Sequence, residues 1–259
     1  MQPHLCKNCE HVFQGNFCSN CGQKTNTVRL NWHYIQDELK YTFLHINKGL
    51  LFTVKQLLTR PGNSVREFIE GKRVQHYKPI LLVFVLAGLN GLLSHYFHFE
   101  KMFTKLEELS ASQQQQKKLP FNQADIYTWI VDHYAIFELG LLPIISLCSW
   151  LAFKKWGYNY VENIIINSYA SGARLAVSIL LFPLIYIARN NDFFLILTSI
   201  SGFLSVGITI WLYIQLYKNH ELGKVILRIL LFGFLFMIFY LLIVVLGILY
   251  LFATYLPNQ

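Results

Sequence analysis

Four cysteines near the start of the chain have the spacing of a metal-binding ribbon. Cys6 and Cys9 form one Cys-x2-Cys pair, and Cys18 and Cys21 form a second pair after eight intervening residues. Four thiolates arranged in two such knuckles can surround one tetrahedral ion, and Zn²⁺ favours closed sites made entirely of sulfur. A zinc ion held in this way has no open position for water. The spacing therefore predicts a structural zinc site and not a catalytic one.

Two disulfide bonds are the alternative interpretation of these four cysteines. The residues before Cys6 do not resemble a secretory signal peptide, so we expect the cysteines to lie in the reducing cytoplasm and to bind metal. Metal binding would supply much of the folding free energy of so small a unit, with Phe13 and Phe17 covering it. The fifth cysteine, Cys148, lies in an apolar run and is expected to be a small buried hydrophobic residue.

The composition of the chain indicates a membrane protein. Of the 259 residues, 54% are hydrophobic and 14% are charged, which is far from the average of soluble domains. Five apolar runs approach the ~20 residues that cross a hydrocarbon core. They lie at 79–99, 134–153, 161–188, 193–217 and 225–255. The predicted fold class is an all-α integral membrane protein with about five transmembrane helices and a small N-terminal zinc ribbon.

The basic residues of the short loops predict the orientation of these spans, because Lys and Arg mark the cytoplasmic side. They occur before the first span, after the second and after the fourth, which all lie on one side. These residues are Lys72, Arg73, Lys78, Lys154, Lys155, Lys218 and Lys224. On the other side, the 100–133 segment holds four lysines and five acidic residues. We therefore expect a cytoplasmic N-terminus and an outside C-terminus, which also keeps the cysteines reduced.

The segment between the ribbon and the first span is basic. Residues 1–78 hold eleven Lys and Arg and five acidic residues, which gives +6 of the net charge of +8. We divide the chain into the ribbon at 1–25, cytoplasmic amphipathic and juxtamembrane helices at 26–78, and a transmembrane domain at 79–259. Basic residues at the membrane entry suit lipid phosphate headgroups, although ordinary topology marking explains them equally well. These headgroup-binding candidates are Arg60, Arg66, Lys72, Arg73 and Lys78.

Three short elements are predicted within this segment. Apolar residues recur at helical spacing from Arg29 to Ile46, which predicts an amphipathic helix. It could pack on the rest of the protein or lie in the headgroup layer, and both alternatives stay open. A second apolar element is expected from Leu50 to Leu58. Ser64-x-x-Glu67 resembles a capping box, so a third helix is expected from about Val65, ending at Gly71.

The order of short motifs over residues 5–90 resembles one protein family. The cysteine ribbon is followed by Gly49-Leu50-Leu51-Phe52-Thr53, Leu58-Thr59-Arg60-Pro61-Gly62, Glu70-Gly71-Lys72-Arg73 and Tyr77-Lys78-Pro79. This order is similar to a bacterial zinc-ribbon membrane family known only as a domain of unknown function, number 3667. The resemblance implies a multi-pass protein of the bacterial inner membrane with a cytoplasmic ribbon, and it implies no activity.

The third predicted span carries polar residues on one face. Asn163, Asn167 and Arg174 lie within about 40° of each other on a helix and form one polar stripe. Glu138 of the second span is expected at a similar depth, and an ion pair with Arg174 would lower the insertion cost of both charges. Such a pair could be a functional site or a structural contact that fixes helix register, and both alternatives stay open.

These observations predict a non-catalytic inner-membrane protein that presents a cytoplasmic platform of ribbon and helices to a protein partner. The alternative is a channel, transporter or lipid-handling protein with an intramembrane polar site made of Glu138, Asn163, Asn167 and Arg174. The lipid bilayer and a protein partner or second copy of the chain are the expected partners. Nucleic acid is not expected, because residues 6–21 hold one lysine and lack a basic-aromatic stripe. The sequence has no phosphate-binding glycine loop, metalloprotease motif or nucleophile elbow, so we predict no enzymatic activity.

Overall fold

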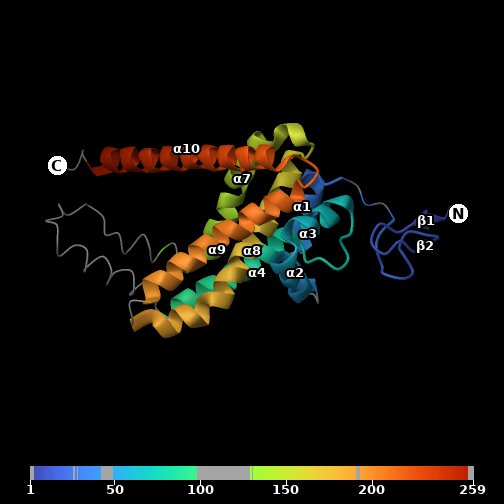
Figure 1. The fold of residues 1–259 in the computed structure, drawn as a ribbon, viewed down its shortest axis with the longest axis horizontal. Helices are drawn as coiled ribbons and strands as arrows, with labels where there is room; N and C mark the ends of the chain where they lie inside the picture. The colour runs from blue at the N-terminus through green and yellow to red at the C-terminus, as the bar shows by residue number, and fades with distance from the viewer. Residues whose placement is uncertain are drawn as a thin grey trace.

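The computed structural model describes residues 3–25, 27, 29–41, 49–97, 129, 131–190 and 193–255. Within these ranges a small ribbon lies at one end of a bundle of helices (Figure 1). The ribbon strands are β1 (His4–Leu5) and β2 (Val12–Phe13). The helices are α1 (Trp32–Tyr41), α2 (Gly49–Thr59), α3 (Pro61–Glu70), α4 (Pro79–Tyr96), α7 (Tyr134–Phe153), α8 (Tyr160–Ile187), α9 (Phe193–Leu216) and α10 (Leu222–Tyr255), with short turns η1 (Lys154–Trp156) and η2 (Ala188–Asn190).

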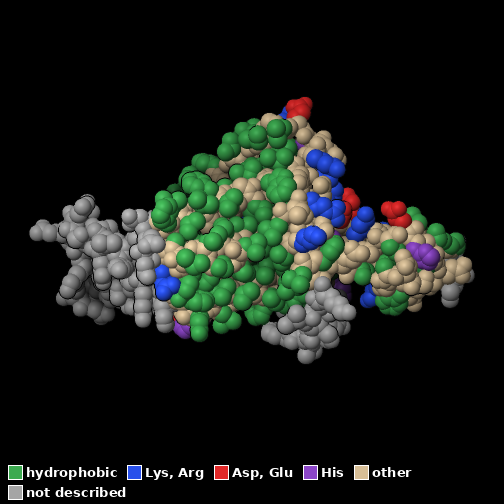
Figure 2. All heavy atoms as spheres, turned by 60° about the horizontal axis from the view of Figure 1, so that its bottom comes forward, with side chains coloured by type: hydrophobic (Ala, Val, Ile, Leu, Met, Phe, Trp, Pro, Cys, Tyr) green, Lys and Arg blue, Asp and Glu red, His purple; other side chains and the backbone are tan. Residues whose placement is uncertain are grey.

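Five helices in the described part of the chain are long and apolar enough to cross a membrane. They cover Pro79–Tyr96, Tyr134–Trp156, Tyr160–Ile187, Phe193–Leu216 and Leu222–Val245. Each overlaps one of the five predicted apolar runs, so the predicted helical membrane fold is confirmed. Figure 2 shows a broad hydrophobic surface with Lys and Arg side chains gathered mainly at its border with the ribbon end. This distribution suits a body embedded in a bilayer and flanked by headgroups.

Helix α8 is the centre of the bundle. Every residue from Val161 to Ala173 is buried, because α4, α7 and α9 surround the helix together with α2 and α3 (Figure 1). The close packing depends on Gly172, where an added Cβ would lie 2.6 Å from Leu82 and 3.7 Å from Leu57. A small residue at this point therefore lets α4 and α2 approach α8 together.

Helix α1 packs on the bundle by one face. Leu30, just before the helix, and Ile35 are buried in the main core. Trp32 is exposed and its ring lies 5.9 Å from that of Tyr160 at the start of α8. The structure thus supports packing of this helix on the protein, and Trp32 stays largely exposed at the edge of that contact. The last part of the predicted helix, residues 42–46, lies outside the described residues.

Helix α3 begins earlier than the sequence pattern predicts. It starts at Pro61, since proline at the first helical position loses no internal hydrogen bond and its backbone angle already suits a helix. The predicted capping box at Ser64 is wrong: this residue lies inside the helix, and its buried hydroxyl has no partner among the described residues. The predicted end at Gly71 is confirmed, where φ is 115° and glycine is favoured.

Helices α3 and α9 meet almost backbone to backbone. A Cβ on Gly62 would overlap the main chain of Leu212 and Leu216. The Gly62 N–H donates to Gln215 Oε1 at 3.1 Å, and Arg66 donates to the carbonyl oxygens of Gln215 and Leu216. These are among the last four carbonyl groups of α9, which have no partner within their own helix. Arg66 therefore caps α9 and places a positive charge at the negative end of the helix dipole.

Helix α10 is attached to the bundle near its start. Val225 is buried, and Arg228 donates to the Ala152 carbonyl while its guanidinium lies 4.6 Å from the ring centre of Trp156. Across residues 236–245, no described side chain is buried. The helix therefore leaves the bundle as it runs away from the ribbon (Figure 1).

Candidate functional site

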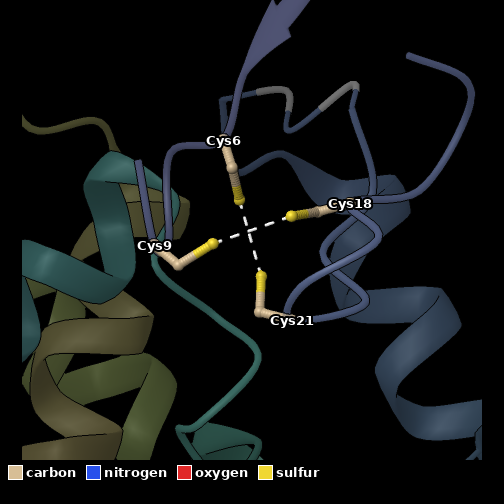
Figure 3. Close-up of side chains that lie close together, drawn as sticks. All are labelled: Cys6, Cys9, Cys18 and Cys21. Carbon is tan, nitrogen blue, oxygen red and sulfur yellow. Dashed lines mark hydrogen bonds between the residues drawn. The ribbon is translucent and has the colours of Figure 1, made fainter. Parts of the chain in front are cut away.

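The four predicted metal ligands converge on one point of the ribbon. All four Sγ atoms lie within 4.8 Å of one another and point toward a common centre (Figure 3). The Sγ atoms of Cys6 and Cys21 are 3.5 Å apart, and those of Cys9 and Cys18 are 3.6 Å apart. Sulfur atoms in a tetrahedral site with Zn–S bonds of about 2.3 Å are about 3.8 Å apart. None of the four cysteines forms a disulfide bond. The distances between their sulfur atoms fit four ligands of one ion and are too long for S–S bonds.

The same turn in both knuckles sets the direction of the cysteines. The Cys6 carbonyl accepts a hydrogen bond from Glu10 N–H at 2.9 Å, and the Cys18 carbonyl accepts one from Gly22 N–H at 2.8 Å. Each turn ends in a left-handed residue, with φ of 59° at Glu10 and 75° at Gly22. Glycine adopts this conformation freely, whereas at Glu10 it carries a small steric cost. The repeated turn brings the two cysteine pairs face to face.

The ribbon therefore holds a candidate metal centre with four thiolate donors. Cys6 and Cys18 are buried, while Cys9 and Cys21 are half-buried. Soft sulfur ligands in this arrangement suit zinc or iron. Because the protein supplies all four donors, a bound ion would hold the ribbon together and would leave no position for a reactant.

One side of the ribbon docks on the helical body. Gln23 is buried, and its Nε2 donates to the Gly71 carbonyl at 2.8 Å. The ribbon therefore rests on the turn that ends α3. Phe13 is buried next to the cysteines as predicted. The predicted cover by Phe17 is wrong, because this side chain is 57% exposed.

The other side of the ribbon carries an apolar pair in solvent. Leu5 and Val12 face each other across β1 and β2 and are 67% and 60% exposed. Directly opposed residues of an antiparallel pair project from the same face of the sheet. We call Leu5 and Val12 the ribbon face.

An ion pair ties the linker after the ribbon to α8. Arg29 Nε and Nη2 each lie 2.8 Å from one carboxylate oxygen of Glu162. Glu162 also accepts from Asn159 N–H, while the Asn159 side chain accepts from Glu162 N–H, which makes a capping box at the start of α8. Sequence reasoning missed both the ion pair and this capping box. Only the capping box had a signal in the sequence, which is Asn-x-x-Glu directly before an apolar run.

Asn163 and Asn167 belong to a hydrogen-bond network between α7, α8 and α9. Ser149 Oγ donates to Asn163 Oδ1 at 2.9 Å, and Asn167 Nδ2 donates to Ser149 Oγ at 2.8 Å. Tyr213 donates its hydroxyl hydrogen to Asn167 Oδ1 at 3.0 Å. All four residues are buried, and sequence reasoning missed Ser149 and Tyr213. Because the polar groups satisfy one another, the network joins three helices in one register.

Arg174 and Glu138 form the ion pair that their depth predicted. Arg174 Nη2 lies 3.1 Å from Glu138 Oε1 and donates to Ser171 Oγ at 2.7 Å. One turn further along α8, Ser178 Oγ donates to Asn90 Oδ1 at 3.3 Å, which brings α4 into the cluster. The structure thus divides the polar stripe of α8 into an interhelical network near the ribbon and an ion pair further away. A functional role for either part stays a prediction.

Most of the five headgroup-binding candidates have partners within the protein. Arg60 pairs with Glu67 at 3.0 Å, and Arg66 caps α9. The Arg73 guanidinium lies 5.4 Å from the ring centre of Tyr34, and burial lowers the pKa of this arginine below its ordinary value. Lipid binding by the set stays a prediction. Lys78 also interacts within the protein and, like Lys72, is half-buried.

One family model matches part of this architecture. The family is described as a protein of unknown function (DUF3667), and the match covers residues 47–90. This segment contains α2, α3 and the first part of α4, which pack against α8. The match confirms the resemblance inferred from the motifs of this segment. Comparisons with curated proteins and with solved structures gave no match.

Proposed function

We propose that this protein, whose residues 47–90 match domain-of-unknown-function family 3667, is a non-catalytic protein of the bacterial inner membrane. In this proposal its zinc ribbon and the helices beside it form a cytoplasmic platform for a protein partner. The membrane helices anchor the platform. The observation that carries the proposal is the exposed ribbon face formed by Leu5 and Val12.

The ribbon face is available because the ribbon docks by its other side. Gln23 and Gly71 hold the ribbon on the end of α3, while Leu5 and Val12 stay in solvent. A two-stranded sheet also has two open edges, each with unpaired backbone groups. An apolar pair beside an open edge suits a partner that adds an extended strand or an apolar surface. Zinc in the four-cysteine centre would keep the strands in place.

The charge distribution supports a cytoplasmic position for the platform. The loop after α7 carries Lys154 and Lys155, and the loop between α9 and α10 carries Lys218 and Lys224. Both loops lie at the ends of their helices nearest the ribbon, where Figure 2 shows the basic side chains gathered. Because basic loops stay in the cytoplasm, the ribbon would lie there too.

Photo-crosslinking in cells tests the platform. A photoreactive amino acid is placed at Val12, and in a matched control at Phe203 of α9, which is 78% exposed and lies outside the platform. We expect one adduct of defined mass from position 12, lost when Cys9→Ser removes a metal ligand, and no such adduct from position 203. If position 12 gives no adduct, or the same adduct with and without Cys9, the ribbon is not the partner-binding surface.

A further inference from the structure

Arg174 uses only part of its hydrogen-bonding capacity inside the bundle. Both of its hydrogen bonds come from Nη2, one to Glu138 and one to Ser171. Within the part of the chain that the structure describes, Nε and Nη1 have no acceptor. A guanidinium carries five N–H donors in a planar fork whose geometry matches the oxygens of phosphate and carboxylate groups. Most of this fork is therefore available to a ligand.

The free part of the guanidinium is accessible. The Arg174 side chain is 29% exposed, whereas the Glu138 side chain is 11% exposed. Inside a membrane span an accessible charge requires a polar partner, because lipid tails offer no acceptor. Glu138 balances the charge of Arg174 but accepts through one oxygen, which leaves N–H donors of the guanidinium without an acceptor among the described residues. The arrangement fits an arginine that is held in place by one carboxylate and shared with a second acceptor.

The ion pair lies near the start of α7 and at the middle of α8, where Arg174 is 14 residues from Tyr160 and 13 residues from Ile187. Toward the end of the bundle away from the ribbon, His95, near the end of α4, contacts Asp132 at 3.0 Å between Nδ1 and Oδ1. Glu138 follows Asp132 by six residues, which is about 9 Å at 1.5 Å per residue. Arginines at this depth reach headgroup phosphates through extension of the side chain and local thinning of the bilayer. A lipid phosphate at Arg174 therefore requires local thinning of the bilayer beside α7 and α8.

Polar and apolar groups around the pair suit an anionic head on an apolar tail. Asn90 and Ser178 place an amide and a hydroxyl one turn beyond Arg174. Nearby on the same two helices, Phe137 and Leu180 expose their apolar side chains to the outside of the bundle. An oxyanion bound at Arg174 would thus have polar neighbours, and an attached hydrocarbon chain would meet an apolar surface.

We propose that Arg174 binds a phosphate oxyanion beside α7 and α8, with Glu138 and Ser171 holding the guanidinium in position. The phosphate can belong to a lipid headgroup or to free inorganic phosphate. The position within a membrane span favours the lipid. This inference does not depend on the proposed platform.

Binding is measured on the full-length protein, purified in a neutral detergent and freed of lipid. Phosphatidylglycerol and inorganic phosphate are added separately, and bound molecules are counted by native mass spectrometry while the thermal midpoint is followed. We expect saturable binding of phosphatidylglycerol, weakened at least tenfold by Arg174→Gln because charge-assisted hydrogen bonds are lost. Arg189→Gln is the matched control, since this exposed arginine follows the end of α8, 15 residues after Arg174. If inorganic phosphate binds as well as the lipid and with the same dependence on Arg174, the site recognises free phosphate.

The Glu138→Gln variant separates a binding site from a structural pair. Removal of the competing carboxylate should keep or strengthen phosphate binding, whereas loss of a merely structural pair would harm both variants alike. If Arg174→Gln does not fold, the double variant Glu138→Gln/Arg174→Gln removes both charges together and should not bind. The proposal is wrong if either Arg174 variant binds like the wild type, or if Glu138→Gln loses binding to the extent that Arg174→Gln does.

Discussion

Replacement of Gly62 by alanine tests the close contact between α3 and α9. The added Cβ would overlap main-chain atoms of Leu212 and Leu216 and would lie 2.6 Å from Gln215 Cβ. Favourable carbon–carbon contacts lie at about 3.5–4.0 Å. Main-chain atoms of a helix cannot rotate away as a side chain can. Helix α3 must therefore move from α9 by about 1 Å.

The size of the effect follows from three contributions. Overpacking of this kind costs about 1–3 kcal/mol. Movement of α3 also weakens the hydrogen bond from Gly62 N–H to Gln215, which contributes about 1 kcal/mol. Alanine recovers about 1 kcal/mol of helix propensity relative to glycine. The expected net destabilisation is about 1–3 kcal/mol, which lowers the thermal midpoint by about 3–10 °C.

The assay is thermal unfolding of the purified protein in detergent, followed by circular dichroism. Gly140→Ala is the matched control, because Gly140 lies inside α7 and an added Cβ there meets nothing within 4 Å. The control should keep or raise the midpoint, since alanine favours the helix. Equal midpoints for the two variants would refute the backbone contact between α3 and α9.

Three further variants test other parts of the structure. Cys9→Ser should lose bound zinc, which elemental analysis measures. Cys148→Ser should retain it, because Cys148 is buried in α7 away from the ribbon. Equal zinc content in the two variants would contradict the proposed centre. Burial lowers the pKa of His76 to about 4, below its unfolded value, so stability should fall by at most about 3 kcal/mol as the pH drops from about 6.5 to about 4. His76→Phe should flatten this part of the midpoint–pH profile, and an unchanged profile would exclude His76 as its cause. Arg29→Ala removes the partner of the buried Glu162 carboxylate and should destabilise the protein by about 1–3 kcal/mol, measured as a lower midpoint; an unchanged midpoint would show that the pair contributes little.

Features that depend on local sequence were the most predictable. Cysteine spacing predicted the convergence of the four thiols, since a Cys-x2-Cys knuckle is made within one turn. The length of the apolar runs identified the five spans, because a span needs about 20 consecutive apolar residues. The Glu138–Arg174 pair could also be predicted, because residues on consecutive antiparallel helices can be matched by counting from their connection.

Features that depend on distant neighbours could not be predicted in this way. Ser149 and Tyr213 look like ordinary members of apolar runs, and only the packing of three helices brings them to the asparagines of α8. The error at Ser64 has a related cause. Ser64-x-x-Glu67 and Pro61 are both typical of a helix start, and packing of Pro61 and Gly62 against neighbouring helices favoured the earlier start of α3. Phe17 illustrates the same limit, because Phe13 is buried in the ribbon core whereas Phe17 is exposed.

The central position of α8 has a consequence for the order in which the protein is assembled. Arg29 and Glu162 are separated by 133 residues, so synthesis at 5–20 residues per second needs about 7–27 s to produce the second after the first. During this interval α2 and α3 have no α8 to pack against, and their apolar side chains are available to the bilayer surface and to chaperones. Docking of the linker waits for the third span to enter the membrane. The part of the chain that is made first is therefore among the last to reach its final place.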